Sequence, residues 1–150
     1  MTAGQDQARK LIVVGVDGSP QSVEALRLGR RLAELTGCRL KAVTAWQFPV
    51  LRSDYPAIDW NPLEGPEQVI SETVHAAFGD DVPPDMERVA VRGQAAHVLA
   101  EESRGAEMLV VGKRGRGGFK GLRLGSVSTA IAAHAHCPVL LTHHEPDPAD

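Results

Sequence analysis

The sequence predicts an α/β fold in which helices cover both faces of an open, doubly wound parallel sheet of five strands. Short apolar runs alternate along the chain with segments whose apolar residues recur every three or four positions. The runs are typical of strands buried on both faces, and the segments between them are typical of amphipathic helices. A chain of 150 residues has the usual size of one domain, so we expect a single domain with right-handed crossovers between its strands.

The first strand and helix are predicted over residues 11–36. Residues 11–16 form a continuous apolar run that contains three valines. Ser19 can cap the N-terminus of the following helix, and Pro20 suits its first position. Gly37 is well placed to end this helix. The predicted apolar face of the helix consists of Ala25, Leu28, Leu32 and Leu35.

The remaining elements continue the alternation. We expect strands at residues 40–45, 86–91, 108–111 and 139–142, and helices at 66–78, 94–104 and 126–134. The strand at 86–91 alternates apolar and polar residues most clearly, which favours an edge of the sheet. Residues 46–65 contain three prolines and are predicted to form a long loop. The acidic tail at 145–150 contains two prolines, and we expect it to be disordered.

Charge is unevenly distributed along the chain, whose net charge is −3. No Asp or Glu lies between Glu107 and Glu145. The basic residues of that stretch are Lys113, Arg114, Arg116, Lys120 and Arg123. A basic segment in an otherwise acidic chain favours a small anionic ligand over long nucleic acid, which usually requires a broad basic face. The polar N-terminus and the lack of a long apolar run predict a cytoplasmic protein that binds no membrane.

The densest chemical signal is a glycine-rich segment that follows the predicted fourth strand. Its glycines include Gly112, Gly115, Gly117, Gly118 and Gly125. Successive backbone amides in such a segment can enclose an anion, and the N-terminus of the next helix attracts phosphate. The segment lacks the Lys-Ser/Thr pair of a Walker loop, and the first strand lacks the dinucleotide fingerprint. A flexible, solvated basic loop is the alternative interpretation.

The spacing Gly112-x2-Gly115-x9-Gly125-Ser126 resembles the ATP-binding signature of the universal stress protein family. Residues 13–19, Val-Val-Gly-Val-Asp-Gly-Ser, are similar to the first strand and turn of that family, and residues 137–141 are similar to its last strand. The similarity covers residues 10–143. It implies the strand order 3-2-1-4-5, which places the first turn and the glycine-rich segment together where the winding direction reverses.

The resemblance implies ATP as the ligand, with or without Mg²⁺, and a role for each matching residue. Gly15 and Asp17 would lie near the nucleoside, with the Asp17 carboxylate accepting a hydrogen bond from the ribose. A solvated turn acid is the alternative for Asp17. The backbone of Ala45 would face adenine. The phosphates would be held by Gly112, Lys113, Arg114, Gly115, Arg116, Gly117, Gly118, Gly125, Ser126 and Val127. Lys113 departs from the family, which often has a small residue there.

The function implied is that of a regulatory nucleotide sensor in stress physiology. A slow ATPase or phosphotransferase using the same site is the alternative, although no nucleophile–base pair or carboxylate pair supports a catalytic residue. An RNA-binding patch would require stacking aromatics, and Phe119 alone lies near the basic residues. His134, His136 and Cys137 have a spacing that does not direct them to one metal. Cys38 and Cys137 are too few for a disulfide framework.

A homodimer is expected through the last strand, which is an edge strand in the implied order. Its residues, none of them charged, are Val139, Leu140, Leu141 and Thr142. A second copy related by a two-fold axis would satisfy both exposed edges, and the resemblance points the same way. The alternative is that the tail folds back over the edge. The loop at 46–65, which holds four of the six aromatic residues, is expected to cover part of the nucleotide, unless its aromatics simply pack on the domain.

Overall fold

Strands and helices alternate in the computed structural model, which describes residues 9–47, 64–112 and 126–142. The strands are β1 (Leu11–Gly15), β2 (Arg39–Trp46), β3 (Glu87–Arg92), β4 (Met108–Gly112) and β5 (Val139–Thr142). The helices are α2 (Pro20–Thr36), α3 (Glu64–Phe78), α4 (Ala95–Glu102) and α5 (Ser126–His134). The predicted elements are therefore all present, and their boundaries differ from the predicted ones by at most two residues.

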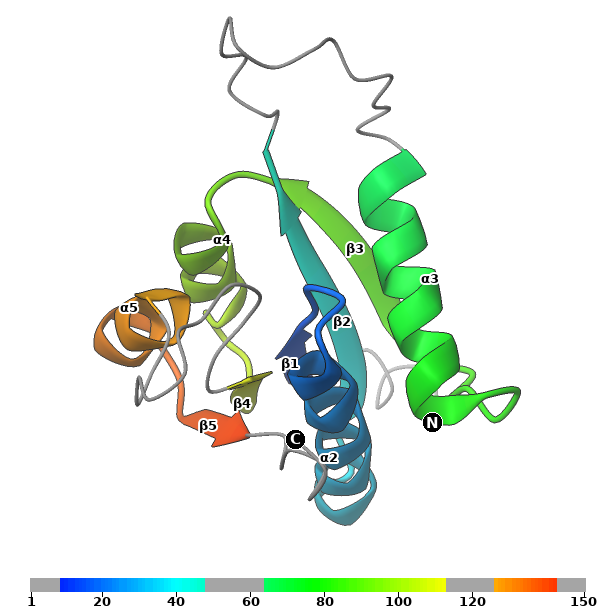
Figure 1. Cartoon of the computed structure of the whole chain (residues 1–150). Coiled ribbons are helices and arrows are strands. Elements are labelled where there is room, and N and C mark those ends of the chain that lie inside the picture. Colours follow the sequence, from blue (N-terminus) through cyan, green and yellow to red (C-terminus); the bar gives the residue numbers. More distant parts are fainter. Residues whose placement is uncertain (1–8, 48–63, 113–125, 143–150) are drawn as a thin grey trace, which may run out of the picture.

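The five strands form one parallel sheet in the order β3-β2-β1-β4-β5. This order confirms the fold class and the topology that the resemblance implies. Helices α2 and α3 lie on one face of the sheet, and α4 and α5 lie on the other (Figure 1). The strands β3 and β5 are the two edges, as expected from their sequences and from the implied order.

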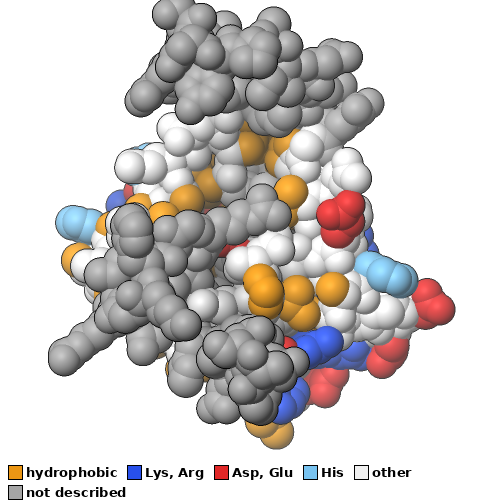
Figure 2. Space-filling model, viewed as in Figure 1, with side chains coloured by type: hydrophobic (Ala, Val, Ile, Leu, Met, Phe, Trp, Pro, Cys, Tyr) orange, Lys and Arg blue, Asp and Glu red, His pale blue; other side chains and the backbone are white. Residues whose placement is uncertain are grey.

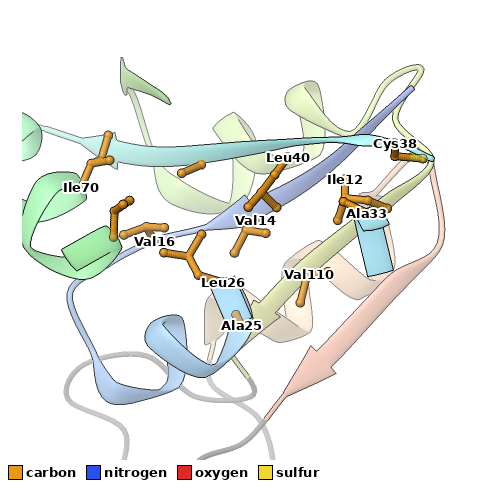
Figure 3. Packing of buried hydrophobic residues seen from close by; sticks show 12 residues of the cluster. Ile12, Val14, Val16, Ala25, Leu26, Ala33, Cys38, Leu40, Ile70 and Val110 are labelled. Atoms are coloured by element: carbon orange, nitrogen blue, oxygen red, sulfur yellow. The ribbon is translucent and has the colours of Figure 1, made fainter. Parts of the chain in front are cut away.

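The central strand β1 contributes to a hydrophobic core on each face because successive side chains point to opposite sides. Ile12 and Val14 are fully buried beneath α2, in a cluster that also includes Leu26 and Leu40 (Figure 3). Val13 lies on the other face, in the core shared with α4 and α5. Both faces of β1 are therefore closed, which explains its continuous apolar sequence.

Helix α2 has the ends that the sequence predicts. Ser19 is the N-cap, and its side chain accepts a hydrogen bond from the backbone N–H of Ser22. Pro20 is the first helical residue, and Gly37 ends the helix in the left-handed conformation with φ of 73°. These local signals depend on a few adjacent residues, which is why they can be recognised without knowledge of the packing.

The predicted apolar face of α2 is wrong at its C-terminal end. Leu35 is 82% exposed, whereas the residues that face the sheet include Leu26, Gly29 and Ala33. A Cβ at Gly29 would lie 2.7 Å from Val14 Cγ2, so the helix approaches β1 closely at a residue without a side chain. The contact between α2 and β1 is therefore made at small residues, and the spacing of the leucines does not identify it.

Helix α4 ends at Glu102, two residues before the predicted end at Arg104. Ser103 is fully buried at this end and its hydroxyl donates to the Ala100 carbonyl at 2.6 Å. The same hydroxyl accepts from the backbone N–H of His136 at 2.8 Å. This contact ties α4 to the connection between α5 and β5, an interaction over 33 residues that local sequence does not reveal.

Charged side chains gather at the ends of α2 and α3 that are distant from the carboxyl ends of the strands (Figure 2). Arg30 pairs there with Glu34 at 3.1 Å and with Asp81 at 3.2 Å. Such exposed ion pairs each contribute about 0–1 kcal/mol to the free energy of unfolding.

Candidate functional site

Strands β1 and β4 separate at their carboxyl ends. The last paired residues of these two strands are Val14 and Val110. Beyond them, β1 continues to pair with β2 as far as Gly15, and β4 continues to pair with β5 as far as Gly112. The result is a gap at the position where the winding direction of the sheet reverses, and we call it the β1–β4 gap. Open α/β sheets bind ligands at this position.

The hydrogen-bond pattern directs the peptide groups of both glycines into the β1–β4 gap. In a parallel strand the N–H and C=O of one residue point to the same neighbour, and consecutive residues alternate between neighbours. The N–H of Val16 donates to β2, at 2.8 Å from the Val43 carbonyl, so Gly15 faces β4. The N–H of Leu109 donates to the Pro138 carbonyl at 2.9 Å, toward β5, so Gly112 faces β1.

Neither glycine has room for a side chain. A Cβ at Gly15 would lie 2.8 Å from Leu99 Cδ1 and 3.1 Å from Val111 Cγ1. A Cβ at Gly112 would lie 2.8 Å from Gln21 Cβ. Packing within the protein therefore favours glycine at both positions, more strongly at Gly112, where the contact is with the Cβ of Gln21 and not with the flexible end of a side chain.

The turn between β1 and α2 brings Asp17 to the same end of the sheet. Asp17 is exposed, and its Oδ1 accepts a hydrogen bond from the Ser19 backbone N–H at 2.9 Å. Gly18 between them has φ of 84°, which a residue with a side chain rarely adopts. Asp17 is therefore a solvated turn residue in the structure, which was the alternative to its predicted contact with the ribose. A carboxylate has further acceptor capacity, so the ribose role stays a prediction.

Ala45 lies beside the gap at the end of β2. Strand β1 last pairs with β2 at Val43, two residues earlier, and the carbonyl of Val43 faces β1. Ala45 therefore faces the β1 side as well. The next carbonyl, that of Trp46, accepts from Gly93 of the β3–α4 connection at 2.8 Å, which agrees with this alternation. Ala45 thus lies near the end of β2, and its contact with adenine stays a prediction.

The first turn of α5 approaches the gap from the opposite face. Ser128 Oγ donates to the Gly112 carbonyl at 2.6 Å, which joins α5 to the end of β4. Ser126 and Val127 are exposed in this turn. Ser126 is the first residue of α5 as described.

Several predicted site residues lie outside the described part of the chain. They are Lys113, Arg114, Gly115, Arg116, Gly117, Gly118 and Gly125. The predictions for the loop at 48–63 and the tail at 145–150 also fall outside it. The structure thus brings together Gly15, Asp17, Ala45, Gly112 and the start of α5.

Three residues around the gap were not predicted from the sequence. Thr44 donates its hydroxyl to the Val16 carbonyl, Gln21 covers Gly112, and Ser128 binds the Gly112 carbonyl. Each is a common polar residue whose partner lies in another element. A sequence signal exists only for Ser128, which is close to the family-like Gly125-Ser126 pair.

Among the described residues, no group of three His, Cys, Asp or Glu side chains is arranged to hold a metal ion. Cys38 and Cys137 are both free thiols; Cys38 is buried, and Cys137 is half-buried. Burial raises the pKa of the Cys137 thiol, which makes it less reactive at neutral pH. None of the described helices has the length and apolarity needed to span a bilayer.

The strand order and the gap between the first and fourth strands define a doubly wound α/β domain of the ligand-binding kind. The chain belongs to the universal stress protein family, whose sequence model matches residues 8–143. This match confirms the family resemblance.

Curated relatives include proteins of mycobacteria. The chain is 38% identical over 132 residues to universal stress protein Rv2623 of Mycobacterium tuberculosis, covering 87% of this chain and 44% of the relative. It is 34% identical over 145 residues to universal stress protein Mb2019 of Mycobacterium bovis, covering 92% of this chain and 45% of the relative. The chain thus spans less than half the length of these relatives.

Solved structures share the fold. A universal stress protein in complex with cAMP is 27% identical, with a TM-score of 0.66 over 90% of this chain and 97% of the other. A universal stress protein from Archaeoglobus fulgidus in complex with dAMP is 17% identical, with a TM-score of 0.64 over 89% of this chain and 97% of the other. The second likeness concerns the fold alone.

Proposed function

We propose that this chain binds ATP in the β1–β4 gap and acts as a regulatory nucleotide-binding protein of the stress response. The observation that carries the proposal is the convergence of Gly15, Asp17, Gly112 and the first turn of α5 at the point where β1 and β4 separate. Each of these features belongs to the family-like sequence pattern. The topology brings them together from segments more than 90 residues apart in sequence.

Family membership and one relative support an adenine nucleotide as the ligand. The cAMP complex shows that a universal stress protein with 27% identity to this chain can hold an adenine nucleotide. ATP is the more specific proposal because the glycine-rich segment and its basic residues offer amides and positive charge for several phosphates. A companion Mg²⁺ would neutralise part of the triphosphate charge.

The proposed roles divide the ligand into two halves. The Ala45 backbone and Asp17 would contact adenine and ribose, respectively. Gly112 and the residues of 113–118 would surround the phosphates, together with Gly125, Ser126 and Val127. A helix N-terminus with exposed Ser126 and Val127 amides is favourable for a negative group.

Calorimetric titration with ATP tests this proposal. The wild-type chain should bind one ATP per chain, and Gly115→Val should abolish binding while the circular dichroism spectrum is unchanged, because a branched side chain blocks backbone approach. Leu35→Val is the control, since Leu35 is 82% exposed and lies outside the site. ATP binding by Gly115→Val with wild-type affinity would refute the assigned role of the glycine-rich segment.

We also propose that two copies of the chain pair through β5. Strand β5 is a sheet edge, and its apolar residues Val139, Leu140 and Leu141 are only half-buried. Because Leu109 donates to the Pro138 carbonyl, the alternation makes the N–H of Leu141 point away from β4. An exposed strand edge of this kind offers hydrogen bonds to another strand.

Sedimentation of the wild type at micromolar concentration should give twice the chain mass of 16.0 kDa. Leu141→Pro should give a monomer, because it removes an outward N–H without removing a bond to β4. Leu35→Val is again the control and should remain a dimer, because Leu35 lies in α2, away from β5. A monomeric wild type would contradict the proposed pairing.

A further inference from the structure

The Gly112 carbonyl is held by a buried hydroxyl that the sequence pattern does not include. Ser128 is 3% exposed, and its Oγ lies 2.6 Å from the Gly112 oxygen. One turn further along α5, Ile131 is fully buried in the core between the sheet, α4 and α5. The hydroxyl therefore projects from a helix whose position is fixed by that core.

The remaining contacts restrict Gly112 from other directions. On the α2 side, Gly112 lies so close to Gln21 that an added Cβ would be 2.8 Å from Gln21 Cβ. On the β5 side, Gly112 is in register with Thr142, whose hydroxyl donates to the preceding carbonyl, that of Val111, at 3.5 Å. The Gly112 peptide is thus enclosed by α2, α5 and β5 at the edge of the β1–β4 gap.

The N–H and the C=O of Gly112 have opposite effects on an anion bound in the gap. Because Gly112 faces β1, both its N–H and its C=O point toward the gap. A free carbonyl oxygen there would repel a phosphate, whereas an N–H would attract it. A hydroxyl that donates to this oxygen offsets its repulsion of a phosphate and leaves the Gly112 N–H, which belongs to the preceding peptide group, for the ligand.

We propose that Ser128 is a positioning residue for the phosphate half of the ligand. By holding the Gly112 carbonyl, it fixes the peptide from which the glycine-rich segment starts and keeps the first turn of α5, with Ser126 and Val127, beside it. This inference rests on the proposed nucleotide site. It assigns to Ser128 no contact with the ligand itself.

The test compares ATP with adenosine, which lacks the phosphates, by calorimetry or by displacement of a fluorescent ATP analogue. In Ser128→Ala the affinity for ATP should fall roughly tenfold, a change that corresponds to about 1.4 kcal/mol. The affinity for adenosine should change less than about twofold, because Ser128 acts on the phosphate half. Ser128→Thr, which keeps the hydroxyl, should restore most of the affinity for ATP.

Ser103→Ala is the matched control. Ser103 is also a buried serine with a 2.6 Å bond to a carbonyl, but it lies at the C-terminal end of α4, away from the gap. This variant should lose stability without losing affinity for either ligand at a temperature where it is folded.

The outcomes separate the two proposals. Equal losses of ATP and adenosine affinity in Ser128→Ala, or no loss of either, would overturn the role of Ser128 and leave the nucleotide site standing. A wild-type chain that binds neither ligand would overturn the nucleotide site and the role of Ser128 together.

Discussion

Substitution of Gly29 by alanine tests the packing that holds α2, and with it Gln21 and the β1–α2 turn, against the sheet. The new Cβ would lie 2.7 Å from Val14 Cγ2 and 3.2 Å from Leu40 Cδ1, and both of these side chains are almost completely buried. Val14 is β-branched and sits in a central strand, so its side chain has little freedom to rotate away. The helix must therefore move outward.

Two effects of opposite sign determine the magnitude. Alanine is better than glycine inside a helix by about 1 kcal/mol, and overpacking a core costs about 1–3 kcal/mol. Since the contact below 3.0 Å is with a stiff buried side chain, we expect the second effect to win and the free energy of unfolding to fall by about 1 kcal/mol.

Urea denaturation followed by circular dichroism measures this change. Val14→Ala removes the methyl group that the new Cβ meets, so the same glycine substitution should be neutral or stabilising in that background. This double-mutant cycle isolates the Gly29–Val14 contact. A Gly29→Ala protein as stable as the wild type, with no coupling to Val14, would refute the close approach of α2 to β1.

Two predictions concern the ligand site. Asp17→Ala should weaken ATP binding about tenfold or more, because a ribose hydroxyl of the bound nucleotide loses its acceptor, at about 1–3 kcal/mol. Wild-type affinity in this variant, with an unchanged circular dichroism spectrum, would show that Asp17 serves only the turn. ATP should also change the fluorescence of Trp46, which follows Ala45 in β2, and Trp60→Phe leaves Trp46 as the single tryptophan for this measurement. An identical emission spectrum with and without saturating ATP would count against adenine binding beside Ala45.

The sequence predicted the parts of the fold that depend on neighbouring residues. The ends of α2 follow from Ser19, Pro20 and Gly37, whose capping roles are local. The prediction of the buried face of α2 was partly wrong, because the contact with β1 is made at Gly29 and Leu35 is exposed. Which face of a helix is buried depends on its partner, and the partner strands are distant in sequence.

The candidate site shows the same division. The positions of Gly15 and Gly112 were predicted from motifs, and the topology brings them to one gap. The reasons that packing gives for these glycines, namely Leu99 and Gln21, come from other elements and could not be seen in advance. Ser128 was missed because a serine in a short helix is more often exposed, and its burial depends on the end of β4.

The most direct test of the central claim is an ATP titration followed by backbone amide NMR. If ATP binds in the β1–β4 gap, saturable shift changes are expected at the amides that surround it, namely those of Gly15, Asp17, Ala45, Gly112, Ser126 and Val127. The amides of Ser103 and Glu107, at the opposite end of the sheet, should not shift. Saturable changes confined to that opposite end, or no saturable change at any amide, would contradict the nucleotide site.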